Sequence, residues 1–345
     1  LRLRSEGLEM KTLKLLTALI YGVCLSTAGS VYAETPTLTV YTYSSFTSEW
    51  GPGPLIKKAY ETRCQCNLKF VGLEDGAALL SRLKLEGNRT SADVVLGLDT
   101  SLIAEAQATE LLAPHDLNTA NINLAVTWSD SYFLPYDFGY FGFVYDSERI
   151  QAPPKTLKDL MLNPDSPPVI IQDPRTSTPG LGLILWARKV FGDDDISAWE
   201  KFASKIVTVT KGWSEAYGLF LKGEAPMVLS YTTSPAYHRH IENSERYRVA
   251  MFDDGHYQQV EVVARLASSK NPTLAQDFLS FMLSDDVQKI LPTTNWMLPA
   301  VKTGQPLPEA FKENEIPKVV LGFTPEEVSA NRKNWIKRWL GAVAK

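Results

Sequence analysis

Residues 135–146 read Pro-Tyr-Asp-Phe-Gly-Tyr-Phe-Gly-Phe-Val-Tyr-Asp, and this stretch decides how the rest of the chain is divided. Its aromatic side chains alternate with other residues, a pattern typical of a β-strand. The stretch lies where one series of strand and helix patterns ends and a second series begins. We therefore expect it to be extended and to cross between two domains.

On its amino-terminal side, strand and helix patterns alternate. Strands are expected at 38–43, 67–73 and 92–97, with helices at 54–61 and 77–86 between them. Strands separated by helices of about ten residues predict βαβ units and a mostly parallel sheet. In such sheets, ligands bind outside the carboxyl ends of the strands.

A second α/β series follows on the carboxyl-terminal side. Its expected strands are 169–172, 206–210 and 226–231, and its expected helices lie near 156–161, from about 181, and at 214–221. Residues 258–264 alternate like a strand and are a plausible return crossing, before helices at 274–283 and from Pro325. The predicted fold class is α/β with two lobes: lobe I (34–140 plus 265–345), lobe II (141–264), and hinges near 135–146 and 257–264.

Composition and charge exclude several classes of protein. The 345 residues include 35 basic and 39 acidic side chains, for a net charge of −4, and 44% are hydrophobic. Such a composition is globular, and it lacks the basic character of a nucleic-acid binder. We therefore expect no nucleic-acid partner.

Residues 1–33 have the pattern of a cleavable export signal. Lys11 and Lys14 follow Met10, an apolar run covers 15–25, and small residues precede a cleavage point after Ala33. The run is too short to span a membrane, so we expect a signal peptide from Met10 and release of a soluble protein. Of the three cysteines, Cys64 and Cys66 would remain. They could form a disulfide in an oxidising compartment, or stay free because the ring would be small and strained.

Four loops join expected strand ends to expected helices. They are residues 43–45, 74–76, 173–180 and 231–235. The last two place hydroxyl side chains before a proline at a helix start, where backbone N–H groups and the helix dipole can hold an anion such as phosphate. For any one loop, helix capping alone is the alternative. Several such loops facing one cleft favour ligand binding.

Trp213 and Tyr231 each follow an expected strand, and we expect these two strands to be adjacent. Both rings would then lie at the cleft, where a flat heterocycle or an organic cation could stack with a gain of roughly 1–2 kcal/mol per face. Asp75, from the other lobe, would be its anionic partner. The alternative is that Trp213 is an ordinary core residue.

Patterns for catalysis and metal binding are weak. The sequence contains no G-x-S-x-G, no Walker loop and no G-x-G-x-x-G after a strand. His238, His240 and His256 lack the carboxylate or cysteine spacing of a metal site, so we expect solvated or capping histidines. Gly180 and Gly182 are expected to permit close helix packing.

Several longer strings are distinctive of one family. They include LTVYTYSSFTSEWGPGP (38–54), VGLEDGAALLSRLKLEG (71–87), the aromatic stretch at 135–146, IQDPRTSTPGLGL (171–183), VTVTKGWSEAYGLFLKGE (207–224) and LSYTTSPAYH (229–238). In these strings the chain resembles the periplasmic thiamine-binding proteins, the soluble receptors of bacterial thiamine ABC transporters. The resemblance runs from Leu38 nearly to the carboxyl terminus.

The resemblance implies a periplasmic binding protein fold of type II-like architecture, with a ligand cleft between two lobes. It implies a monomeric receptor, not an enzyme, that needs no cofactor or metal and works in the periplasm. Its ligands would be thiamine, thiamine monophosphate and thiamine diphosphate, passed to an ABC permease and its ATPase. The ligand residues carried over are Asp75, Gly76, Ser177, Thr178, Trp213, Tyr231, Thr232, Thr233 and Ser234; Tyr43 and Tyr237 are added on position and chemistry. The phosphate could lie at 177–178 or at 232–234.

Two rival functions are less consistent with these residues. A ferric-ion or other small-ligand receptor would share the fold, but iron binding usually needs adjacent tyrosines, and Thr232 follows Tyr231. An exported thiamine-acting enzyme would need a nucleophile in the cleft. Cys64 and Cys66 lie between the first helix and the second strand, away from the loops at the strand ends.

Overall fold

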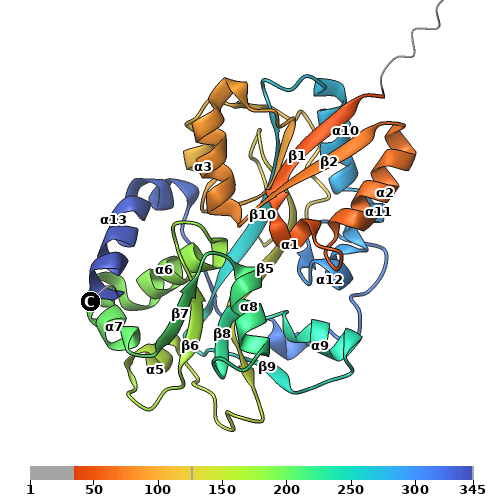
Figure 1. Ribbon diagram of the computed structural model, residues 1–345. Coiled ribbons are helices and arrows are strands. Elements are labelled where there is room, and N and C mark those ends of the chain that lie inside the picture. Colours follow the sequence, from red (N-terminus) through yellow and green to blue (C-terminus); the bar gives the residue numbers. More distant parts are fainter. Residues whose placement is uncertain (1–34, 126, 344–345) are drawn as a thin grey trace, which may run out of the picture. The chain divides into compact units, whose positions relative to one another are not determined.

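The computed structural model describes residues 35–125 and 127–343, and the chain from Pro36 onward forms one compact unit (Figure 1). The predicted signal region, residues 1–33, lies outside the described residues. In the described part of the chain, no helix combines the length and the apolar character needed to cross a membrane.

The strands are β1 (Thr37–Tyr43), β2 (Asn67–Leu73), β3 (Val94–Asp99), β4 (Leu112–Ala113), β5 (Leu134–Asp146), β6 (Val169–Gln172), β7 (Ile206–Thr210), β8 (Met227–Tyr231), β9 (Tyr247–Ala250), β10 (His256–Leu266), β11 (Leu298–Pro299) and β12 (Val320–Leu321). The α-helices are α1 (Ser44–Thr47), α2 (Gly53–Cys64), α3 (Gly76–Glu86), α4 (Ile103–Gln107), α5 (Leu157–Leu162), α6 (Thr178–Phe191), α7 (Asp195–Ala203), α8 (Trp213–Leu221), α9 (Pro235–Ile241), α10 (Pro272–Met282), α11 (Asp285–Gln288), α12 (Leu291–Thr294) and α13 (Pro325–Val343). Short 3₁₀ helices lie at Gly87–Arg89, Gly192–Asp194 and Glu313–Glu315.

Side-chain caps mark the start of two helices near the strand ends, α3 and α6. The Asp75 carboxylate accepts a hydrogen bond from the N–H of Gly76 at the start of α3. Ser177 caps α6 in the same way, with a proline in its first turn. Each cap satisfies an N–H group that the helix leaves free, and proline suits the first turn because it has no N–H to satisfy.

The strands join in the order β2-β1-β3-β10-β5-β8-β6-β7. β1 and β2 are parallel, with Thr37 opposite Asn67 and Tyr43 opposite Leu73, and β6 is parallel to both β7 and β8. Two antiparallel strands, β5 and β10, connect these parallel groups (Figure 1). The predicted α/β class with mostly parallel units is therefore confirmed.

The aromatic stretch at 135–146 forms almost all of β5. Its first half pairs with β10, and its second half pairs with β8 and β9. The stretch is therefore extended, as predicted, and carries the chain from one group of parallel strands to the other. The division into lobes at the predicted boundaries stays a prediction.

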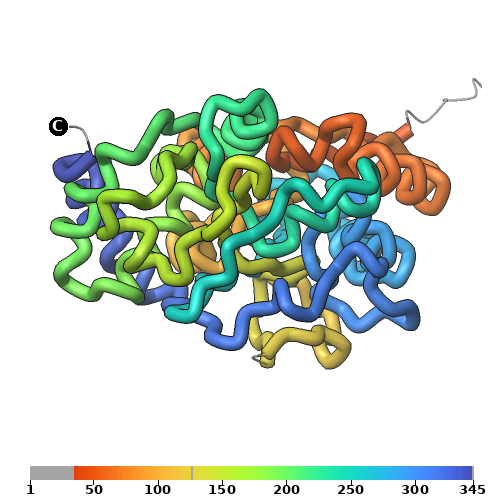
Figure 2. The backbone as a smooth tube through the Cα atoms, turned by 90° about the horizontal axis from the view of Figure 1, so that it is seen from below, coloured from red at the N-terminus to blue at the C-terminus, as the bar shows by residue number. Residues whose placement is uncertain are grey.

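Close packing of α6 depends on its glycines. A Cβ atom on Gly182 would lie 2.0 Å from the Phe141 ring on β5, and one on Gly180 would lie 2.5 Å from the carbonyl oxygen of Gln172. This confirms the predicted close approach. The C-terminal helix α13 packs in turn on α6 and α7, and Figure 2 shows its dark-blue trace beside the green one.

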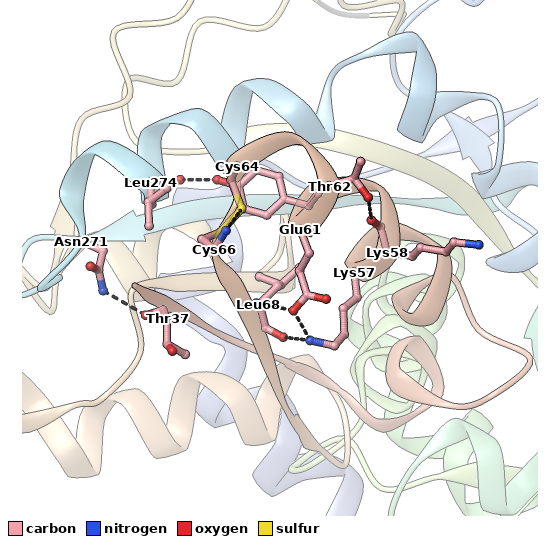
Figure 3. Close-up of a disulfide and its surroundings, with 11 residues drawn as sticks. Thr37, Lys57, Lys58, Glu61, Thr62, Cys64, Cys66, Leu68, Asn271 and Leu274 are labelled. Atoms are coloured by element: carbon pink, nitrogen blue, oxygen red, sulfur yellow. Dashed lines mark hydrogen bonds and ion pairs between the residues drawn. A yellow bond between two sulfur atoms is a disulfide. The ribbon is translucent and has the colours of Figure 1, made fainter. Parts of the chain in front are cut away.

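Cys64 and Cys66 form a disulfide, which resolves the open alternative about these two thiols. The bond joins the last residue of α2 to the turn before β2 (Figure 3). Gln65 between them has a left-handed backbone, with φ of 52°. β2 then runs for seven residues, roughly 20 Å at the usual rise per residue, before the loop that contains Asp75. The cysteines therefore lie far from the carboxyl end of β2 and the loop that follows it, as predicted.

Candidate ligand-binding site

A cavity of about 280 Å³ opens beside the carboxyl ends of β1, β2 and β8, a volume suited to a small ligand. It is lined by Tyr43, Ser45, Trp50, Asp75, Trp213, Ser214, Tyr217, Gly218, Leu221, Tyr231, Ser234, Tyr237, Glu261, Asn295, Trp296 and Met297. Aromatic rings are the most frequent side chains. None of the described residues that line it is basic, whereas two are carboxylic acids.

Trp213 lies in one wall of the cavity, but for a different reason from the predicted one. It is the first residue of α8, and β6 separates the strands β7 and β8, which were expected to be adjacent. Because α8 packs over both β6 and β8, it brings the indole beside β8, where Nε1–H donates to the Ser230 hydroxyl over 2.8 Å. The indole stacks on Tyr217, with ring centroids 5.0 Å apart.

Other aromatic rings complete the walls. Tyr237 and Trp296 meet edge to face with centroids 5.4 Å apart. The Tyr231 hydroxyl donates to the side-chain oxygen of Gln259 over 2.8 Å. The ring centroids of Trp50 and Trp213 are 6.3 Å apart. Because Trp50 is 49% exposed, it lies at the solvent-facing edge of the cavity. Planar ligands gain dispersion and quadrupole energy between such rings.

Asp75 connects two helix N-termini at the cavity. Its Oδ1 accepts from the N–H of Gly76 over 3.3 Å, and its Oδ2 accepts from the Ser177 hydroxyl, the cap of α6, over 2.9 Å. Burial raises the pKa of Asp75 to about 7, although the hydrogen bond from Ser177 opposes the shift. Asp75 is therefore a mixture of charged and neutral forms at neutral pH.

The structure brings six of the predicted site residues into the cavity wall, and the other five are not among its lining residues. Those in the wall are Tyr43, Asp75, Trp213, Tyr231, Ser234 and Tyr237. Ser177 reaches the cavity only through Asp75, and Gly76 permits close contact, since a Cβ there would lie 2.5 Å from the Thr178 hydroxyl. Thr232 and Thr233 are buried, and their hydroxyls have no hydrogen-bond partner among the described residues.

Sequence reasoning missed several lining residues. Trp50 and Tyr217 lay inside distinctive strings but were not selected. Glu261 is a charged residue within the alternating pattern at 258–264, and this mismatch was a usable signal. Asn295, Trp296 and Met297 had no local signal, because only the packing of the chain after α12 places them here.

Of the two expectations, solvated or capping histidines, the solvated one is wrong for His238 and His256, which are both fully buried. The ring of His238 is hydrogen-bonded to the Tyr217 hydroxyl (2.9 Å) and to Glu242 (2.7 Å). His256 is bonded to the carbonyl oxygen of Phe141 over 2.8 Å. Burial lowers the pKa of both rings, which favours their neutral forms. Among residues 35–125 and 127–343, no group of three or more His, Cys, Asp or Glu side chains could hold a metal ion.

Comparison with known proteins shows the family to which this chain belongs. Residues 54–289 match the family model described as bacterial extracellular solute-binding protein. The chain belongs to this family. Membership makes the protein a solute-binding receptor and not an enzyme, as predicted.

Individual relatives are similar over nearly the whole chain. A thiamine-binding periplasmic protein of Escherichia coli is 54% identical over 91% of this chain and 95% of its own length. One from Brucella suis is 48% identical over 97% of this chain and 100% of its own length. A solved structure, a periplasmic thiamin binding protein, superposes with a TM-score of 0.88 at 54% identity, covering 90% of this chain and 97% of that one. The predicted periplasmic binding protein fold is confirmed.

Proposed function

We propose that this protein is a periplasmic receptor that binds thiamine, thiamine monophosphate or thiamine diphosphate and delivers the ligand to an ABC permease and its ATPase. The observation that carries the proposal is a cavity with aromatic walls, two carboxylic acids and no basic side chain among its described lining. The names of the close relatives support the same ligand.

The chemistry of thiamine matches this lining. Its thiazolium ring carries a permanent positive charge, and its aminopyrimidine is flat with hydrogen-bonding edges. Trp213, Tyr231 and Tyr237 offer ring faces and edges to both heterocycles, since cations and aromatic planes bind well to such rings. The carboxyl group of Glu261 supplies negative charge, and Asp75 adds a second carboxyl group to the lining.

The hydroxyethyl or phosphate end of the ligand belongs near Asp75. There the N-termini of α3 (11 residues) and α6 (14 residues) come together through the bond from Ser177 to Asp75. Backbone N–H groups and the positive ends of helix dipoles favour an anion. A proton on Asp75, whose pKa is raised to about 7 by burial, removes its repulsion of a phosphate. We thus favour residues 177–178 over 232–234 for the phosphate.

Native mass spectrometry of protein purified without denaturation tests the proposal, followed by calorimetric titration of ligand-free protein with each of the three compounds. We expect one molecule bound per chain and recovered unchanged after long incubation. If none of the three compounds binds, the proposal is wrong. Cleavage of thiamine during the incubation would instead identify an enzyme.

A further inference from the structure

Two buried carboxyl groups lie next to each other beside the cavity. Glu261 on β10 is directly opposite Asp137 on β5 in the antiparallel ladder. Directly opposite residues project from the same face of a sheet, with Cβ atoms about 5 Å apart. Glu261 lines the cavity and is 7% exposed, whereas Asp137 is completely buried behind it.

The hydrogen bonds around the pair are unequal. Glu261 accepts from three donors: the Tyr43 hydroxyl over 2.7 Å, the Tyr136 hydroxyl, and the side-chain amide of Gln259 over 2.8 Å. Asp137 accepts from the side-chain amide of Asn295 over 2.6 Å, and its Oδ1 has no partner among the described residues. Because a buried carboxylate needs donors to stay ionised, the negative charge belongs on Glu261 and the proton on Asp137.

Nearby charges favour the same assignment. Burial and the charge of Glu261 raise the pKa of Asp137 well above its ordinary value, which favours its protonated form. Burial also raises the pKa of Glu261, while the hydrogen bonds from Tyr136 and Tyr43 oppose that shift.

The elements around the pair bring further titratable groups. They are Tyr43 on β1, Asp99 on β3, Tyr136 on β5, Tyr231 on β8 and Asp75 before α3. Burial raises the pKa of Asp99, and the positive charge of Arg332 on α13 opposes this shift. Among the described residues, no basic side chain forms an ion pair with Glu261. Its charge thus has no ion-pair partner in the part of the chain that the structure describes.

We propose that Glu261 is the residue that selects a positively charged ligand, and that Asp137 is a positioning residue that stays neutral beside it. The inference rests on the proposed function and names the group that recognises the thiazolium charge. A cation that enters the cavity supplies the missing partner for a carboxylate that is already desolvated. Most of the desolvation cost of this ion pair is therefore met by the fold before the ligand arrives.

Asp75 is the competing candidate for this role, but its surroundings suit it less. It lies at the positive ends of two helix dipoles, which repel a cation. Glu261 lies on a strand and not at a helix N-terminus. Two residues of the cavity wall are hydrogen-bonded to the carboxyl pair: Tyr43 donates to Glu261, and Asn295 donates to Asp137. The thiazolium ring therefore belongs on the Glu261 side, with the hydroxyethyl or phosphate end toward Asp75.

The test compares thiamine with 3-deazathiamine, an uncharged analogue of the same shape in which carbon replaces the quaternary nitrogen. Calorimetry on the wild-type protein should show that thiamine binds at least tenfold more tightly than 3-deazathiamine. Glu261→Gln should weaken the binding of thiamine at least tenfold and leave the affinity for 3-deazathiamine within about threefold of the wild-type value. Asp137→Asn mimics a neutral acid and should keep the wild-type preference within about threefold, as should Asp75→Asn.

Each contrary result is decisive. A wild-type preference below threefold overturns the proposal and needs no variant, so the test holds even if Glu261→Gln fails to fold. If Glu261→Gln keeps the preference for thiamine over 3-deazathiamine, the proposal is also overturned. The same holds if Asp137→Asn or Asp75→Asn loses this preference. Failure of thiamine and of both of its phosphate esters to bind the wild-type protein would instead contradict the proposed function, so the two failures are distinguishable.

Discussion

Trp213 lies in the cavity wall although it is the first residue of a helix. Its ring is held on one side by Tyr217 and at its nitrogen by Ser230, which leaves the remaining surface for the cavity. We expect Trp213→Ala to weaken thiamine binding at least tenfold, about 1.4 kcal/mol, as measured by calorimetry. Trp213→Phe, which keeps a flat ring, should recover part of the loss. Native affinity in the alanine variant would remove Trp213 from the site.

Asp75 should make the stability of the ligand-free protein depend on pH. Its pKa is raised to about 7 by burial, whereas an unfolded aspartate titrates near 3.9. The folded state therefore binds the proton more tightly, so the stabilisation is complete below about pH 4 and is lost as the pH rises through about 7.

Asp75→Asn cannot ionise, so its melting temperature relative to the wild type should rise between pH 5 and pH 8. Each kcal/mol of difference in the free energy of unfolding should raise the melting temperature of the variant relative to the wild type by roughly 2–4 °C. Differential scanning fluorimetry measures this difference. The exposed Asp253 provides the control variant, Asp253→Asn. If the difference in melting temperature between Asp75→Asn and the wild type stays constant from pH 5 to pH 8, the pKa shift of Asp75 is contradicted.

At the scale of elements, two helix-interior glycines give a matched comparison. A Cβ on Gly182 of α6 would collide with Phe141 of β5, whereas a Cβ on Gly218 of α8 would meet nothing within 4 Å. Gly182→Ala should therefore destabilise the protein by about 1–3 kcal/mol through overpacking. Gly218→Ala should stabilise it by up to about 1 kcal/mol through helix propensity. Urea denaturation measures both, and a neutral Gly182→Ala would show that α6 can shift away from β5.

Strands with strong local patterns were predictable. The bounds of β2, β6 and β7 agree with prediction, because their residue types and flanking turns are local properties of the chain. α7 and β9 were missed, whereas α9 begins at Pro235, where a helix start was expected. The order of strands was also wrong at β7 and β8, since β6 pairs with both. Pairing depends on long-range contacts that a local pattern does not contain.

At the scale of the whole molecule, the predicted hinges near 135–146 and 257–264 fall on β5 and β10, which pair with each other. If the predicted lobes close around the ligand, thiamine should lower the radius of gyration measured by small-angle X-ray scattering. Thiamine at a hundredfold excess over Kd should also stabilise the protein by about 2.7 kcal/mol. Stabilisation without compaction would show that residues from Pro36 onward behave as one rigid body.

The sequence by itself determined the α/β class, the extended stretch at 135–146 and the positions of Asp75, Trp213 and Tyr231 at or just after strand ends. These follow from local periodicity, capping residues and distinctive strings, all of which neighbouring residues specify. Only the tertiary structure decided that Glu261 faces the cavity, with Asp137 opposite it. It also decided that Thr232 and Thr233 are buried and are not among the lining residues. Strand register and helix packing set which side chains meet, and both depend on contacts between residues far apart in the chain.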